Sequence, residues 1–139
     1  MVALGTDGAG STITLDMFEE MKAAAWMHKN AAADPTAVST SDVLTMATTE
    51  GSKVLNLADQ IGTLEVGKKA DIILIDMANK PHLSPITNNL YALLAYSEQG
   101  SDVNTSIING KVVMRNREIL TFDVREVVRQ VQGIVERLL

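Results

Sequence analysis

The amino-acid sequence predicts an α/β fold, and three stretches carry this prediction. Residues 70–75 form a short, apolar, β-branched run between turn residues, which is typical of a strand buried on both faces. Asn109 and Gly110 separate two segments rich in Val and Ile, and this dipeptide is the strongest short indication of a β-hairpin. Asp123, a good N-cap residue, precedes apolar residues at amphipathic helical spacing up to residue 138.

Length and composition limit the possible classes of function. The chain has 139 residues and a mass of 15.0 kDa, which suits one domain with one core. A net charge of −5 argues against a nucleic-acid surface, and no apolar run approaches the roughly 18 residues of a membrane span. Without cysteine, neither a disulfide nor a thiolate metal site can form. We therefore expect a cytoplasmic, mildly acidic α/β domain that binds neither nucleic acid nor a membrane.

The first residues predict a short strand that runs into a turn. Residues 2–4 are apolar, and Gly5 and Gly8 then permit a sharp exit with positive φ. Such an exit would leave the Asp7 carboxylate at the end of the strand. A strand at the first residues leaves no room for a preceding element, which hints at a truncated parent. Taken alone, this stretch is better explained as an ordinary polar turn.

A long helix is predicted next, from Thr14 as N-cap to about residue 30. Acidic residues lie near its N-terminus, where the helix dipole favours them. Met17, Met21 and Met27 have helical spacing, so core packing explains them better than a soft-metal stripe does.

Shorter helices are expected to follow. Ser39 with Asp42 three residues later forms a variant of the capping box. Gly51 is expected to interrupt this helix, and a second one is expected over residues 52–57.

The second half of the chain predicts strands, turns and two helices. After the strand at 70–75, a proline-containing loop at 79–85 leads to a short helix at 88–96. The hairpin strands are expected at 103–109 and 111–115, with a further turn at Asn116 and Arg117 before a short apolar pair.

Five sequence blocks in this order resemble the C-terminal part of the amidohydrolase superfamily. The blocks are LGTDG at 4–8, LDMFEEM at 15–21, MAT at 46–48 with Gly51, IGTLEVGKKAD at 61–71 and NGKVV at 109–113. The resemblance is to the nucleoside-deaminase and chlorohydrolase-like branch, and within it to the 5-methylthioadenosine/S-adenosylhomocysteine deaminases. Each block is weak alone, but together they cover nearly the whole chain.

The resemblance implies a fragment of a (β/α)8 barrel joined to part of a small β-sandwich. Residues 1–60 would then hold the last barrel strand and its covering helices. Residues 61–122 would supply the C-terminal sandwich strands with an inserted helix, and residues 123–139 the terminal amphipathic helix. The implied activity of the full-length parent is hydrolytic removal of an amino or chloro group from a purine- or triazine-like ring.

The resemblance also implies a role for Asp7. In the family, an Asp at the end of the last barrel strand is a ligand of a divalent metal, commonly zinc, and moves a proton from the metal-bound water. Asp7 matches that position, so it is the predicted metal and catalytic residue. A carboxylate suits this chemistry because the water must lose a proton near neutral pH and the leaving group must gain one.

The chain departs from the family in its histidines. The family takes its other ligands from a His-x-His pair and two later histidines, whereas this chain has only His28 and His82. Neither matches a family ligand, and both are interpreted as surface or packing residues. One carboxylate cannot make a catalytic zinc site, which needs about three protein ligands. We therefore expect no bound metal and no activity in this chain alone.

Two hypotheses follow for the role of the chain. It is either part of a metal-dependent deaminase or chlorohydrolase, or a stand-alone, non-catalytic module that serves in assembly. In both cases, lost N-terminal strands would leave sheet edges bare, and bare edges invite pairing with another chain. We therefore expect a homo-oligomer that covers residues 70–76 or the hairpin, and a small-molecule substrate only for the parent.

Overall fold

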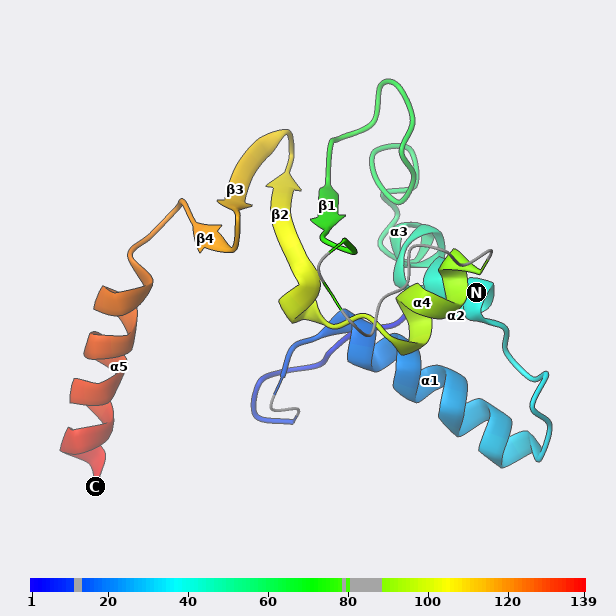
Figure 1. The fold of residues 1–139 in the computed structure, drawn as a ribbon, viewed down its shortest axis with the longest axis horizontal. Helices are drawn as coiled ribbons and strands as arrows, with labels where there is room; N and C mark the ends of the chain where they lie inside the picture. Colours follow the sequence, from blue (N-terminus) through cyan, green and yellow to red (C-terminus); the bar gives the residue numbers. More distant parts are fainter. Residues whose placement is uncertain (12–13, 79, 81–88) are drawn as a thin grey trace.

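A computed structural model describes residues 1–11, 14–78, 80 and 89–139, and these residues form a mixed α/β structure (Figure 1). The helical elements are α1 (Met17–Ala32), α2 (Thr40–Ala47), α3 (Thr49–Val54), α4 (Leu90–Tyr96), the 3-10 turn η1 (Gly100–Asp102) and α5 (Val124–Leu138). The strands are β1 (Ile72–Ile75), β2 (Val103–Ile108), β3 (Lys111–Arg115) and β4 (Glu118–Ile119). Figure 1 shows α1–α4 grouped beside the sheet and α5 at the opposite end. The predicted α/β class is confirmed.

The core lies where α1, α2 and α4 pack together against the start of β2. Its buried apolar side chains are Phe18, Met21, Ala25, Val43, Ala95 and Val103. Full burial of a residue such as Val43 contributes about 1.5–3 kcal/mol relative to an exposed position. The prediction of core packing is therefore right for Met21, but it is wrong for Met27, whose side chain is 71% exposed.

Helix starts follow capping chemistry, although not always at the predicted residue. Asp16 rather than Thr14 is the N-cap of α1, and its carboxylate accepts a hydrogen bond from the Phe18 N–H at 2.9 Å. Thr14 instead donates its hydroxyl to Glu19. The predicted capping box at Ser39 and Asp42 is confirmed, and the hydrogen bonds from Ser39 lower the pKa of the Asp42 carboxyl.

The break between α2 and α3 falls at Thr48, not at Gly51 as predicted. Thr48 has non-helical dihedral angles, whereas the Ser52 N–H donates to the Thr48 carbonyl at 3.0 Å across Gly51. Gly51 is therefore inside α3, and the predicted helix at 52–57 begins earlier, at Thr49. A single glycine lowers helix propensity by about 1 kcal/mol, which does not by itself end a helix.

The strands of the described chain form an antiparallel sheet in the order β1-β2-β3-β4. Asn109 and Gly110 both have positive φ, as a type I′ hairpin turn requires, and Asn116 and Arg117 repeat this pattern before β4. Both predicted turns are confirmed. The prediction that β1 is buried on both faces is wrong, because Ile73 is 49% and Leu74 52% exposed. β1 lies at the edge of the sheet, and no other described strand pairs with its outer side.

The loop between α3 and β1 depends on a close backbone approach at Gly62. Gly62 has a φ of +96°, and a Cβ atom there would lie 2.4 Å from the buried Ser52 hydroxyl. Ser52 cannot move aside easily, because its hydroxyl donates to the Thr49 carbonyl at 2.8 Å. Gly67 has a similar φ of +95°, but a Cβ atom there would meet no described atom within 4 Å.

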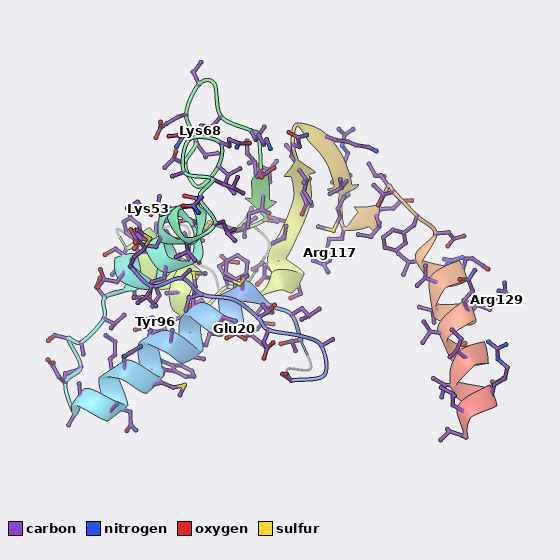
Figure 2. The ribbon with its side chains drawn as sticks, turned by 180° about the vertical axis from the view of Figure 1, so that it is seen from behind. Glu20, Lys53, Lys68, Tyr96, Arg117 and Arg129 are labelled. Atoms are coloured by element: carbon purple, nitrogen blue, oxygen red, sulfur yellow. The ribbon has the colours of Figure 1, made fainter. Side chains whose placement is uncertain are left out.

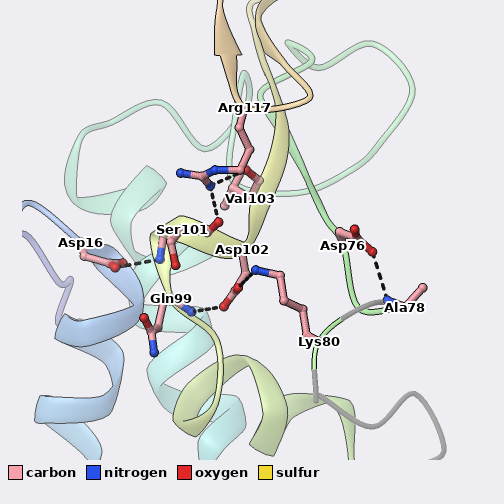
Figure 3. A network of polar contacts seen from close by, with 10 residues as sticks. Asp16, Asp76, Ala78, Lys80, Gln99, Ser101, Asp102, Val103 and Arg117 are labelled. Carbon is pink, nitrogen blue, oxygen red and sulfur yellow. Dashed lines mark hydrogen bonds and ion pairs between the residues drawn. The ribbon is translucent and has the colours of Figure 1, made fainter. Parts of the chain in front are cut away.

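A polar junction joins the helices to the sheet (Figure 3). The second Asp16 carboxylate oxygen accepts a hydrogen bond from the Gly100 N–H at 2.7 Å. Asp102, with a side chain only 2% exposed, accepts from the Gln99 N–H at 3.1 Å and pairs with the Lys80 ammonium. Arg117 donates to the carbonyls of Ser101 and Val103. These contacts fix the turn between α4 and β2 against α1 and against the turn before β4.

We predict that Gly62→Ala destabilises the protein more than Gly67→Ala does. Both changes place a side chain at positive φ, which costs about 1–3 kcal/mol, but only the first also collides with Ser52. Chemical denaturation followed by circular dichroism would measure both free energies of unfolding. Equal losses in the two variants would mean that the contact with Ser52 is unimportant.

We also predict that Asp16→Ala lowers the free energy of unfolding by about 2 kcal/mol, because an N-cap and a hydrogen bond each contribute about 1 kcal/mol. Asp123→Ala is the matched control, since Asp123 caps α5 through the N–H groups of Arg125 and Glu126 and its side chain bonds to no described residue outside that helix. The control should reduce helicity without shifting the main unfolding transition. A main transition shifted equally by both changes would contradict the proposed role of the junction.

Candidate functional site

Residues 2–4, predicted to be a strand, form no regular strand in the structure. One backbone hydrogen bond holds them, from the Leu4 N–H to the Met46 carbonyl of α2 at 3.3 Å, and Leu4 packs against the core. A strand requires neighbours that pair with its N–H and C=O groups, and the described residues provide none at this position. Among the described residues, the segment is thus held by this hydrogen bond to α2 and by the packing of Leu4 against the core.

Asp7 follows this segment and is exposed to solvent. The positive φ of 55° falls on Asp7 itself, whereas Gly5 and Gly8 have no positive φ, so the predicted role of the two glycines is wrong. Aspartate tolerates the left-handed region because its short side chain can bond locally. Here Asp7 Oδ1 accepts a hydrogen bond from the Gly8 N–H at 2.7 Å.

The geometry of Asp7 fits one ligand of a metal but not a complete metal site. A carboxylate has about four lone-pair positions, so the bond from Gly8 leaves capacity for a cation. Among the described residues, however, no group of three or more His, Cys, Asp or Glu side chains could hold a metal ion. A catalytic zinc needs about three protein ligands, so the residues described here do not fit that group on their own.

No described contact joins His28 to Asp7. His28 is exposed on α1, and His82 lies outside the described residues. Asp7 also does not line the apolar hollow of about 420 Å³ between α2, the loop after α3 and β1. That hollow is lined mainly by Leu44, Ala47, Ile61, Leu64, Ile72 and Ile73. Its polar lining residues are Thr48, Thr63, Lys69 and Asp71.

Sequence reasoning missed two buried carboxylates near the start of β2. Glu98 is fully buried and Asp102 almost so, on either side of Gln99 and Gly100. The stretch from Ser97 to Asp102 has the composition of a polar surface turn, so no local pattern indicates the burial. Asp102 has a structural role, since it pairs with Lys80 and caps the 3-10 turn.

Comparison with known proteins gives consistent matches. The model of the amidohydrolase family matches residues 1–113. A 5-methylthioadenosine/S-adenosylhomocysteine deaminase from Caldanaerobacter subterraneus is 51% identical over 138 residues, which are 99% of this chain and 31% of that protein. A 5′-deoxyadenosine deaminase from Methanosarcina acetivorans is 45% identical, over 99% of this chain and 31% of its own length.

Solved structures match in the same way. A zinc-bound adenosine deaminase from Xanthomonas campestris has a TM-score of 0.91 and 33% identity, over 97% of this chain and 30% of its own. An atrazine chlorohydrolase from Arthrobacter aurescens has a TM-score of 0.77 over 96% of this chain and 29% of its own. At 21% identity, this second match supports the fold alone.

The chain thus spans about a third of the length of the curated relatives that it matches. The resemblance inferred from five sequence blocks is confirmed, both for the family and for its deaminase branch. Because the family model covers most of its residues, this chain belongs to the amidohydrolase family.

Proposed function

We propose that this chain is the C-terminal third of a metal-dependent amidohydrolase that removes the amino group of an adenosine-like nucleoside by hydrolysis. The observation that carries this proposal is the 51% identity, over nearly the whole chain, to a methylthioadenosine/adenosylhomocysteine deaminase. The second deaminase relative, at 45% identity, supports an amino rather than a chloro leaving group. By itself the chain is inactive in this proposal, because no three His, Cys, Asp or Glu side chains of the described residues come together to hold a metal ion.

The division of the chain into parts belongs to the same proposal. Residues 1–60 contribute the last barrel strand and its covering helices, residues 61–122 the sandwich strands, and residues 123–139 the terminal helix. The mutual packing of β1–β4, separate from that of α1–α3, supports this division, whereas α4, the inserted helix of residues 61–122, packs on α1 and α2 (Figure 1). Residues 2–4 would pair as a strand once neighbouring barrel strands are present on both sides. The expected cytoplasmic location remains a prediction from composition.

Asp7 is the residue that links this chain to the metal in the proposal. The zinc in the structure of the Xanthomonas deaminase supports a divalent metal in this branch of the family. Asp7 would contribute one carboxylate oxygen, and the remaining ligands would come from polypeptide outside the matched third. When bound, the metal supplies the acidity that makes a water molecule nucleophilic near neutral pH.

A chimera tests the role of Asp7. The Caldanaerobacter deaminase with its matched third replaced by this chain should bind one zinc ion and deaminate 5-methylthioadenosine. Asp7→Asn in the chimera should lower both zinc affinity and activity by at least about 100-fold, since even residues behind the metal ligands contribute 10–100-fold. Elemental analysis after dialysis and a deamination assay would measure the two effects.

Asp59→Asn is the matched control, because Asp59 is also an exposed aspartate and makes no side-chain hydrogen bond or ion pair with any described residue. The control chimera should keep zinc and activity, and the isolated 139-residue chain should hold less than one equivalent of zinc. A folded Asp7→Asn chimera with normal zinc content would refute the assignment. A tight one-to-one site in the isolated chain would show that its own residues assemble a different metal site.

The exposed edge of β1 supports a second candidate function, that of an assembly module. Ile73 and Leu74 are half exposed on a strand whose outer side no described strand covers. Bare edges of this kind promote pairing between chains. Under this candidate, the chain is a homo-oligomer in solution and has no catalytic role.

We predict that light scattering after gel filtration detects this oligomer and that Ile73→Lys weakens it, because a charged edge residue opposes strand pairing. Lys111→Glu is the control, because it changes a charge on the same sheet at a position where β3 already pairs with β2. The control should leave the oligomer intact. A monomer at tens of micromolar, with or without the substitution, would rule out the assembly module.

A further inference from the structure

Helix α5 carries an uninterrupted aliphatic stripe. Its members are Val124, Val127, Val128, Val131, Ile134, Val135 and Leu138, and each is between 42% and 80% exposed. Their spacing of three and four residues places them on one side of the helix. The other side carries Arg125, Glu126, Arg129, Gln132, Glu136 and Arg137. An aliphatic stripe opposite a polar side is the face by which an amphipathic helix packs against another surface.

Within the described residues, nothing packs extensively against this stripe. The element pairs that make substantial contact join α1–α4 to one another and the strands to one another, and α5 is in none of them. Figures 1 and 2 show α5 standing clear of the helices and of the sheet, with Arg129 on its outer surface. A contiguous apolar surface of seven exposed aliphatic side chains on a folded protein marks an interaction site.

The composition of α5 argues against a lipid surface as the occupant. Membrane-surface helices carry Lys and Arg on the polar side and large side chains such as Trp, Phe and Leu on the other. The polar side of α5 instead mixes three arginines with two glutamates, and Glu126 pairs with Arg129 at 2.6 Å. Its apolar side is mainly valine, which suits close contact with another protein element.

Self-pairing of α5 is also disfavoured. The stripe covers only about two heptads, whereas coiled coils are indicated by three to four or more. The helix has 15 residues, a length at which helices depend on tertiary packing for most of their stability. A larger preformed surface than a second α5 is therefore required.

We propose that the aliphatic stripe of α5 docks on the amidohydrolase polypeptide that the chain lacks, equivalent to the unmatched two-thirds of its deaminase relatives. This inference rests on the proposed function. The Xanthomonas deaminase structure aligns with 97% of this chain at a TM-score of 0.91, and this chain covers only 30% of that deaminase chain. The relative therefore holds further polypeptide beside the matched third, and in the proposal this further polypeptide covers the stripe that the matched third leaves exposed.

Two substitutions at adjacent residues test this docking surface. Val131→Glu places a charge in the middle of the stripe, and Gln132→Glu places the same charge on the polar side. In the isolated 139-residue chain, both should leave the melting temperature unchanged, because neither position is packed. In the chimera with the Caldanaerobacter deaminase, Val131→Glu should lower the melting temperature by several degrees, and Gln132→Glu should not.

Hydrogen exchange of the α5 amides provides a second readout. These amides should exchange rapidly in the isolated chain and slowly in the chimera, and Val131→Glu should restore rapid exchange in the chimera. If that variant does not fold, Val131→Ala should show a smaller loss of protection in the same direction. Asp7→Asn should remove zinc from the chimera without changing exchange in α5, so failure of the metal assignment and failure of the docking surface can be distinguished.

Three results would overturn the proposal. The first is equally fast exchange of α5 in the chimera and in the isolated chain. The second is an equal effect of both substitutions on the melting temperature of the chimera. The third is a change from dimer to monomer when Val131→Glu is made in the isolated chain, because the occupant would then be a second copy.

Discussion

The Asp16 carboxylate accepts hydrogen bonds from two backbone N–H groups, one at the start of α1 and one at Gly100, which is 84 positions further along the chain. One oxygen begins the helix that supplies half of the buried core, and the other fixes the turn that leads into β2. A Cβ atom at position 100 would lie 3.0 Å from this carboxylate, so glycine suits the close approach. Together with the packing of Val103 against the helices, this bond places α1 relative to the turn that leads into the sheet.

Local chemistry was enough to predict much of the fold. The capping box at Ser39, the turns at Asn109 and Asn116 and the helix after Asp123 all depend on residues within a few positions of one another. The five blocks of family sequence were similarly sufficient for the family, which the matched relatives confirm. These features can be predicted without knowing which distant parts of the chain pack together.

Features that depend on distant contacts were not predictable in this way. Thr14 and Asp16 are both acceptable N-cap residues. Asp16 is the N-cap of α1, and its carboxylate also accepts a hydrogen bond from the distant Gly100 N–H. The run at 70–75 is apolar enough for a central strand, but its position at the edge of the sheet leaves Leu74 exposed. For the candidate site, the sequence indicated Asp7 through family resemblance alone, and its left-handed backbone was assigned to the wrong residues.

The backbone at Asp7 bears on the proposed role of this residue as a metal ligand. The bond from Gly8 to Asp7 Oδ1 spans adjacent residues, so the orientation of the carboxylate is set within the loop itself. A side chain that is already oriented loses little rotamer entropy on binding, and that entropy otherwise opposes ligation. In the proposed role of Asp7 as a metal ligand, the loop would therefore present a carboxylate whose orientation is set locally by the Gly8 N–H.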